Sequence, residues 1–330
     1  RGFQIIGKAN NLSLNNYDCI LKDNSLKQLE GFMGDMIKET DVDFNIDREL
    51  TDEEIQQIID YNIHDVEETC KVLYYTQGDF DAMLTMIDMF NMDSKMFNKT
   101  KAQLSAHVLG AVRNHTLDDE FDITIPKNLC MPKEYQYVID WFNNPFNKAY
   151  KLPLKDDSQQ DNRQLHTMVA DVPTIVGYGG LHSSRDNQVF EGILVLLDVA
   201  SLYPSLIINE NYSSRNLKEP KLYKEIRDRR LELKAKKDKR QQPLKIVLNS
   251  TYGILKFKES DCYDPLMSNN VCIAGQLYLI ELTARLAPYG VIMQTNTDGI
   301  YIQIDSMDKL PIIKQIAREW EQRTKLELEI

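Results

Sequence analysis

The sequence has few cysteines, no long apolar run near its motifs and a deficit of positive charge. Its five cysteines are an odd set without a CxxC pair, which argues against a disulfide framework or a zinc site. The apolar run at 193–197 is far too short to cross a bilayer, and no charged-then-apolar segment opens the chain. These absences predict a globular protein of a reducing cytosol, neither exported nor held in a membrane.

The charge is strongly uneven along the chain. The 330 residues contain 39 Lys and Arg against 50 Asp and Glu, a formal net charge of −11. Such a balance opposes nucleic-acid binding, because affinity for DNA comes largely from cations that neutralise phosphates. Residues 221–258, however, contain 13 basic and four acidic residues, a local charge of +9, which leaves −20 for the remainder. One strongly basic segment is therefore set in an acidic protein.

The length and the apolar content, 42%, suit two or three domains with real cores. The chain begins at Arg1 and stops at Ile330 just after an amphipathic stretch, which predicts a fragment of a longer protein. Residues 151–167 are polar and poor in bulky groups, so an exposed loop and a soft domain boundary are predicted there.

The amino-terminal third indicates helices. Residues 35–68 contain 13 acidic and two basic residues. A Thr51-Asp-Glu-Glu54 cap signal predicts one amphipathic helix that runs to about Tyr75. Residues 81–115 show similar spacing, and their methionines are interpreted as core with no cofactor implied. Helical spacing in the first segment rests on Ile55, Ile58, Ile59, Ile63 and Val66.

The carboxyl-terminal half alternates strands with a helical hairpin. The apolar run 193–197 lacks alternation and predicts a strand buried on both faces that ends at Asp198. The basic segment predicts a helix to about Lys239, a break at 241–243 and a second helix ending at Gly253. Apolar strands flank Thr295-Asn-Thr-Asp-Gly299, so an Asp-Gly turn predicts a β-hairpin with Asp298 at its tip.

Asp198 and Asp298 are the candidate metal ligands. Two-metal phosphoryl transfer needs carboxylates that hold two divalent cations about 4 Å apart, and a strand end and a hairpin tip can supply them. Either aspartate taken singly is more often an ordinary turn residue.

Three motifs in order give these residues their context. Residues 198–205 read Asp-Val-Ala-Ser-Leu-Tyr-Pro-Ser, residues 245–253 read Lys-Ile-Val-Leu-Asn-Ser-Thr-Tyr-Gly, and residues 296–300 read Asn-Thr-Asp-Gly-Ile. They resemble the DxxSLYPS, KxxxNSxYG and DTDS motifs of family B DNA polymerases. The departure is Asn296, where that family generally has Asp, and the loss of one charge beside two cations weakens their attraction.

The resemblance implies roles for neighbouring residues. Asp198 and Asp298, with Val199, would hold the metal ions, and Lys245 would join them in catalysis. Substrate contacts would come from Ser201, Leu202, Tyr203, Arg230, Lys234, Asn249, Tyr252 and Gly253. In the family the ring at the position of Tyr203 packs under the deoxyribose and excludes a 2′-hydroxyl, although an ordinary core tyrosine is the alternative.

The spacing of the basic segment agrees with those roles. Lys245, Asn249 and Tyr252 fall at i, i+4 and i+7, so one helical face presents a cation, an amide and an aromatic ring. On the preceding helix a cationic stripe of similar spacing is formed by Arg227, Arg230 and Lys234. A charge run alone is usually only a solvated helix face.

Two further elements match the family less strongly. Tyr61-Asn-Ile-His-Asp65 resembles the YxxxD motif of its 3′–5′ proofreading exonuclease, with Tyr61 and Asp65 on one helical face; the DxE and NxxxFD partners are not in this chain, so that activity is expected to be incomplete. Tyr178, Gly179 and Gly180 resemble a YxGG element that contacts DNA, where glycines let the backbone approach a phosphate. A helix surface and a simple turn are the respective alternatives.

The resemblance implies an α+β fold with a polymerase palm, whose sheet is antiparallel, and a helical-hairpin fingers subdomain. These follow the carboxyl-terminal part of an RNase H-like exonuclease domain. We expect the exonuclease part at 1–80, a connecting region at 81–190, palm at 191–216 and 258–330, and fingers at 217–257, with the thumb absent.

The function implied is template-directed DNA synthesis, in which dNTPs are added to a primer 3′-hydroxyl with two Mg²⁺ ions, Mn²⁺ being an alternative. Primer–template DNA and dNTPs are the expected partners, with replisome proteins besides. Short intervals between the motifs imply a nucleic-acid primer and a phage-like enzyme in the cytoplasm of a bacterial host. The rivals are a catalytically weakened, DNA-binding replisome scaffold derived from a polymerase, motivated by Asn296, and a nuclease fragment.

Overall fold

The structure is a computed structural model that describes residues 24–43, 45–113, 119–151, 164–185 and 189–330. The chain folds into two compact units, one made of 1–101 with 233–244 and the other of 102–232 with 245–330. We call them the first and second units. The subdomain limits expected from the sequence stay predictions.

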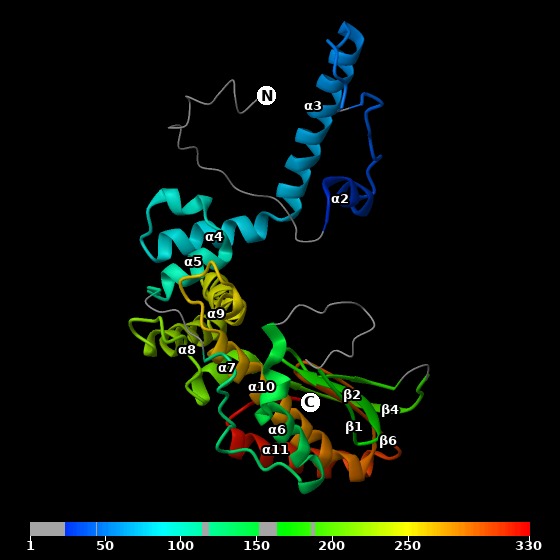
Figure 1. Cartoon of the computed structure of the whole chain (residues 1–330), viewed down its shortest axis with the longest axis vertical. Coiled ribbons are helices and arrows are strands. Elements are labelled where there is room, and N and C mark those ends of the chain that lie inside the picture. Colours follow the sequence, from blue (N-terminus) through cyan, green and yellow to red (C-terminus); the bar gives the residue numbers. More distant parts are fainter. Residues whose placement is uncertain (1–23, 44, 114–118, 152–163, 186–188) are drawn as a thin grey trace. The chain divides into compact units, whose positions relative to one another are not determined.

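The first unit is helical in its described part, with α2 (Leu26–Met33) beside α3 (Asp52–Tyr75), followed by α4 (Gln77–Met89) (Figure 1). The predicted start of α3 is confirmed. The Thr51 hydroxyl accepts from the Glu54 N–H, and the Glu54 carboxylate accepts from the Thr51 N–H in return. This reciprocal cap satisfies two amide donors that the first helical turn would otherwise leave open.

The helix expected across 81–115 is present in pieces. α4 ends at Met89, a short 3₁₀ turn spans Ser94–Asn98, and α5 covers Lys101–Val108. Met83 and Met86 of α4 are buried, as core methionines are expected to be.

The second unit is built on a seven-stranded antiparallel sheet in the order β1-β2-β3-β5-β6-β4-β7 (Figure 1). This sheet and its helices give the unit an α+β fold. The strands are β1 (Gln164–Val169), β2 (Val172–Gly177), β3 (His182–Ser184), β4 (Ile193–Val199), β5 (Val291–Asn296), β6 (Gly299–Ile304) and β7 (Leu328–Glu329).

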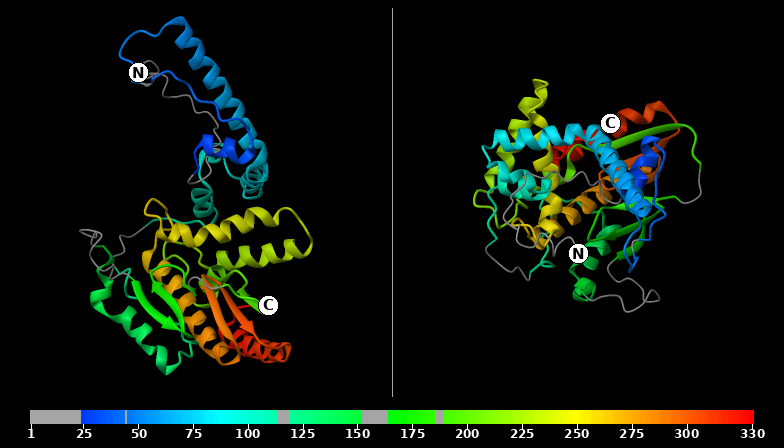
Figure 2. Two further views of the ribbon diagram at one scale, coloured as in Figure 1. Left: turned by 90° about the vertical axis from the view of Figure 1, so that its right-hand side faces the viewer. Right: turned by 90° about the horizontal axis from the view of Figure 1, so that it is seen from above.

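Helices α10 (Pro265–Leu286) and α11 (Leu310–Thr324) lie against one face of this sheet (Figure 2). Alternate strand residues such as Leu197 and Ile302 point into that layer and are fully buried, as is Trp320 of α11. The apolar core therefore sits under the sheet, and its other face is open over β4.

That open face corrects one expectation about β4. Leu194 and Leu196 are 51% and 39% exposed, whereas Val195 and Leu197 are buried. The strand was expected to be buried on both faces, and this is wrong, because an apolar run does not reveal whether a second layer covers it.

The basic segment forms α8 (Lys221–Ala235) and α9 (Gln241–Lys256), joined at 236–240. Their contact includes the Tyr223 hydroxyl, which donates to the Leu248 carbonyl at 3.0 Å. The predicted hairpin is present, but α9 runs through Gly253 because Ile254 and Leu255 continue its buried face. The break also comes before Gln241 and not at 241–243.

The loop expected at 151–167 is wrong at its carboxyl end, where residues 164–167 belong to β1. Residues 152–163 lie outside the described part. Two shorter helices complete the second unit, α6 (Gln136–Asn143) and α7 (Leu202–Asn209). Within the described ranges, no helix is long and apolar enough to cross a membrane.

α10 begins at Asp264, a fully buried carboxylate with several donors. It accepts from the Met267 N–H as the helix cap and from the Arg215 N–H and guanidinium at 2.8–3.0 Å. Arg215 also pairs with the partly exposed Asp119 at 2.6 Å.

We expect Asp264→Ala to lower the free energy of unfolding of the chain by roughly 3 kcal/mol, because it removes a cap and leaves Arg215 without its buried partner. Asp119→Ala, which deletes the solvent-side partner of the same arginine, should cost less than about 1 kcal/mol. Urea denaturation followed by circular dichroism measures both, and equal losses would contradict this assignment.

Candidate functional site

The two predicted aspartates are brought together by the pairing of β4 with β6. Asp198 on β4 is the register partner of Gly299, and the Val199 N–H donates to the Asp298 carbonyl at 2.8 Å. A Cβ at Gly299 would lie 3.3 Å from Asp198 Oδ1. Glycine at this position therefore lets the carboxylate lie closely against the hairpin.

The hairpin that carries Asp298 turns in two residues. Asn296 pairs with Gly299, and Thr297 has a left-handed φ of +56°. The Asp298 N–H donates to the Asn296 carbonyl at 2.6 Å. The predicted hairpin is present, and Thr297 is the left-handed residue of its turn. A β-branched residue in this region is strained, so the turn is held by its surroundings.

A third carboxylate lies at the same place. Glu329 on β7 is the register partner of Asp198 on the other side of β4. Burial raises the pKa of Asp198, and the charges of Asp298 and Glu329 raise it further. Sequence reasoning missed Glu329, although the acidic-apolar alternation of 326–330 is the pattern of a strand with acids on one face.

These carboxylates fit a divalent cation chemically. Among the described residues, neither the Asp198 nor the Asp298 side chain has a hydrogen bond or ion pair, and oxygen donors are those that Mg²⁺ prefers. No group of three or more His, Cys, Asp or Glu in the described ranges forms a ready metal cage. Mg²⁺ usually takes one or two carboxylates and completes its shell with water and substrate phosphate, so two suffice.

Tyr203 follows a sharp bend after β4. Ser201 adopts a left-handed conformation with φ +52° and precedes α7, in which Leu202 is buried. The Tyr203 ring packs on Tyr252 of α9 with centroids 4.3 Å apart, and burial raises the pKa of both phenols. Two predicted substrate residues from separate motifs are thus in contact.

The face of α9 that is predicted to bind the substrate is exposed. Lys245, Asn249 and Gly253 are on the solvent side with the half-buried Tyr252, whereas Val247 is fully buried. The helix therefore presents the predicted cation and amide together with the ring.

The cationic stripe of α8 separates into paired and unpaired members. The Arg227 guanidinium donates to Asp228 at 2.9–3.0 Å. Arg230 has no ion pair among the described residues, its buried Nε lacks a hydrogen-bond partner, and burial lowers its pKa. Arg230 is therefore a cation whose charge is open to an anionic ligand. Lys234 belongs to the first unit, and its substrate contact stays a prediction.

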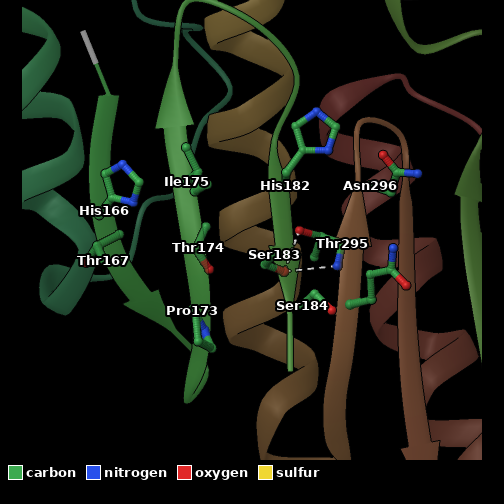
Figure 3. A pocket seen from close by; sticks show the side chains of 11 residues that line it. His166, Thr167, Pro173, Thr174, Ile175, His182, Ser183, Ser184, Thr295 and Asn296 are labelled. Atoms are coloured by element: carbon green, nitrogen blue, oxygen red, sulfur yellow. Dashed lines mark hydrogen bonds between the residues drawn. The ribbon is translucent and has the colours of Figure 1, made fainter. Parts of the chain in front are cut away.

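Beside the hairpin tip, the sheet contains a hollow of about 520 Å³ lined by β1, β2, β3 and β5. His182 on β3 is the register partner of Asn296, and the two side chains are neighbours in Figure 3. Tyr178 precedes this strand, and its ring is buried against Phe121 and Phe142. The predicted DNA contacts of 178–180 stay predictions.

The YxxxD residues share one face of α3, as their spacing predicted, and meet Lys27 of α2. Lys27 Nζ lies 2.8 Å from Asp65 and 4.8 Å from the centre of the Tyr61 ring. Lys27 also binds the fully buried Glu30 at 2.9 Å. Asp65 is therefore already paired with a cation, unlike Asp198 and Asp298.

Known DNA polymerases share sequence with this chain. It is 27% identical over 209 residues to a DNA polymerase of Pyrococcus glycovorans and 26% identical over 208 residues to DNA polymerase 1 of Pyrococcus abyssi. Each match covers 51% of this chain and 26% of the relative. Over about half of its length, the chain is similar in sequence to archaeal DNA polymerases. It therefore spans about a quarter of the length of these curated relatives.

No protein-family model matches this chain. A solved structure of the family B DNA polymerase from the archaeon Pyrobaculum calidifontis aligns with 94% of the chain and 40% of its own, with a TM-score of 0.45 and 14% identity. These relatives are archaeal, and the phage-like origin stays a prediction.

The carboxylate cluster predicts an order of effects on Asp198. Asp298→Asn should lower the pKa of Asp198 more than Glu329→Gln does, and the part due to burial should remain. Between the ordinary and the raised pKa of Asp198, the folded chain binds more protons than the unfolded chain. The free energy of unfolding therefore falls as pH rises through that window. Either substitution should make this fall smaller. Carboxyl ¹³C NMR titration measures the shifts; a larger effect of Glu329→Gln would contradict the assignment.

Proposed function

We propose that this chain contributes the active site of a template-directed DNA polymerase, which adds dNTPs to a primer 3′-hydroxyl by two-metal phosphoryl transfer. The observation that supports it best is the pair of unpartnered carboxylates, Asp198 and Asp298, joined by the β4–β6 register. Curated relatives named DNA polymerase support the same activity at family level.

In this proposal Asp198 and Asp298, with Val199, would hold two Mg²⁺ ions, and Mn²⁺ would serve the same site. When bound, the ions supply activation of the attacking hydroxyl and stabilisation of the leaving pyrophosphate. The protein supplies one carboxylate from the end of β4 and one from the β5–β6 turn, so little reorganisation would accompany the reaction. Glu329 adds a third negative charge, which offsets the neutral amide of Asn296.

The nucleotide would lie between α7 and the exposed face of α9. Arg230 and Lys245 would bind the triphosphate, and Asn249, Tyr252 and Gly253 would face the nascent base pair. Tyr203 would lie under the sugar beside Ser201 and Leu202. The contact of Tyr203 with Tyr252 supports a shared floor for this site, because each ring limits the movement of the other.

The DNA primer end would lie on the open face of the sheet beside the hairpin tip. The hollow there presents polar side chains from several strands, including His182 and Ser184, and such groups donate to phosphate oxygens. Replisome proteins and a cytoplasmic site of action belong to the same proposal.

For the YxxxD face of α3 we propose a role in 3′–5′ proofreading. The ammonium of Lys27 already pairs with the Asp65 carboxylate, and a metal ion would have to displace it. The rival function, a catalytically weakened replisome scaffold, rests on Asn296 and predicts DNA binding without synthesis.

Primer extension by the full-length protein separates these functions. We expect dNTP incorporation with Mg²⁺, reduced to background by Asp298→Ala because a metal ligand is lost. The matched control is Asp308→Ala, an exposed aspartate with its carboxylate on Ser306, which should leave incorporation unchanged. Equal background in the wild-type protein and in Asp298→Ala, with DNA still bound, would favour the scaffold.

Tyr203 has its own test. Tyr203→Ala should increase the ratio of ribonucleotide to deoxyribonucleotide incorporation by at least about tenfold, because the ring no longer fills the space of a 2′-hydroxyl. Single-nucleotide extension with rATP and dATP measures the ratio. An unchanged ratio would make Tyr203 a packing residue for Tyr252 alone.

A further inference from the structure

Residues 177–182 are here called the glycine segment. Several of its backbone carbonyl groups accept hydrogen bonds from other elements of the fold. The Gln276 side-chain amide donates to the carbonyls of Gly177 and Gly179 at 2.6 and 2.8 Å, and its oxygen accepts from the Gly177 N–H at 3.0 Å. Gln276 is 1% exposed. These bonds therefore form inside the protein, where an unmade hydrogen bond is costly.

The glycine segment also joins α9 to the hairpin that carries Asp298. Lys256 Nζ, in the last turn of α9, donates to the Tyr178 carbonyl at 2.8 Å. Three residues further along, the Leu181 carbonyl accepts from the Thr297 N–H at 2.8 Å. One short backbone stretch thus receives a bond from the helix of the nucleotide site and another from the turn of the metal site.

Gly180 fits closely against the same turn. A Cβ at Gly180 would lie 2.7 Å from Thr297 Oγ1 and 3.2 Å from His182 Nε2, whereas a Cβ at Gly179 would meet nothing within 4 Å. Packing therefore requires a glycine at position 180 but not at position 179. Thr297 has a left-handed backbone that its own side chain disfavours, and a side chain at position 180 would collide with it.

We propose that the glycine segment is a positioning element that couples the end of α9 to the catalytic hairpin, with Gln276, Lys256 and Gly180 as its positioning residues. The inference rests on the proposed polymerase function. It differs from the expectation that the glycines let the backbone approach a DNA phosphate and from its alternative, a simple turn. In this proposal each acts on Asp298 through Thr297.

The first test compares the two glycines in the full-length protein. Gly180→Ala should accelerate amide hydrogen exchange at Thr297 by at least about tenfold over the β4 amides, and Gly179→Ala should not. In primer extension, Gly180→Ala should lower kcat about tenfold or more, with KM for dNTP changed less than about twofold. Adding Thr297→Ala, which removes the clashing hydroxyl, should restore both readouts.

The second test uses Lys256. Lys256→Met should accelerate exchange at Thr297 and lower kcat by about tenfold, because a charge-assisted bond to the Tyr178 carbonyl is lost. Lys256→Arg should restore most of both, since its guanidinium can donate to the same oxygen. The matched control is Lys258→Met, an exposed lysine two residues on, which should leave both unchanged.

The outcomes are distinguishable. If exchange at Thr297 rises no more than exchange at the β4 amides, the variants act through global stability and the coupling is overturned. If both alanine variants weaken primer–template binding equally and leave Thr297 exchange unchanged, the segment is a phosphate contact only. A wild-type protein without incorporation would refute the polymerase function, whereas the exchange measurements would still decide the coupling.

Discussion

The register of β4 against its two neighbours is the constraint on which the candidate site depends. It places Asp198 between Gly299 and Glu329, so three carboxylates from distant parts of the sequence share one end of the sheet. Their mutual repulsion is opposed by the strand ladder and by the apolar side chains beneath it, such as Leu197 and Ile302. Because side chains alternate, a slip of one residue would turn Asp198 into the core and expose Leu197.

The charged residues predicted to be functional differ in whether an opposite charge of the protein already pairs with them. Arg227 and Asp65 are ordinary candidates by sequence spacing, yet both already bind an opposite charge. Asp198, Asp298 and Arg230 do not, within the described residues, although burial disfavours the charged forms of Asp198 and Arg230. A charge kept partly buried without a protein partner has no stabilising role, which favours a ligand as its partner.

Local signals carried most of what the sequence could predict. The start of α3 follows from a cap that spans four residues, and the β5–β6 hairpin follows from two apolar runs around a turn. Asp198 and Asp298 were found because each lies in a short motif. Glu329 was not, because its place depends on the pairing of β7 with a strand more than a hundred residues earlier.

The errors have the same physical origin. β4 was expected to be covered on both faces, but covering layers are a property of the tertiary fold and not of an apolar run. α9 was expected to end at Gly253, yet Ile254 and Leu255 find buried places, which outweigh the low helix propensity of one glycine. The partners of Gly179 and Gly180 were likewise out of reach, since Gln276 and Thr297 come from other elements.

The attachment of β7 to α11 has a consequence for the charge beside Asp198. The Leu328 N–H donates to the Glu321 carboxylate of α11 at 2.6 Å, and the next residue, Glu329, pairs with Asp198. A displacement of α11 would therefore move Glu329 relative to Asp198 and change the negative charge that raises the pKa of Asp198.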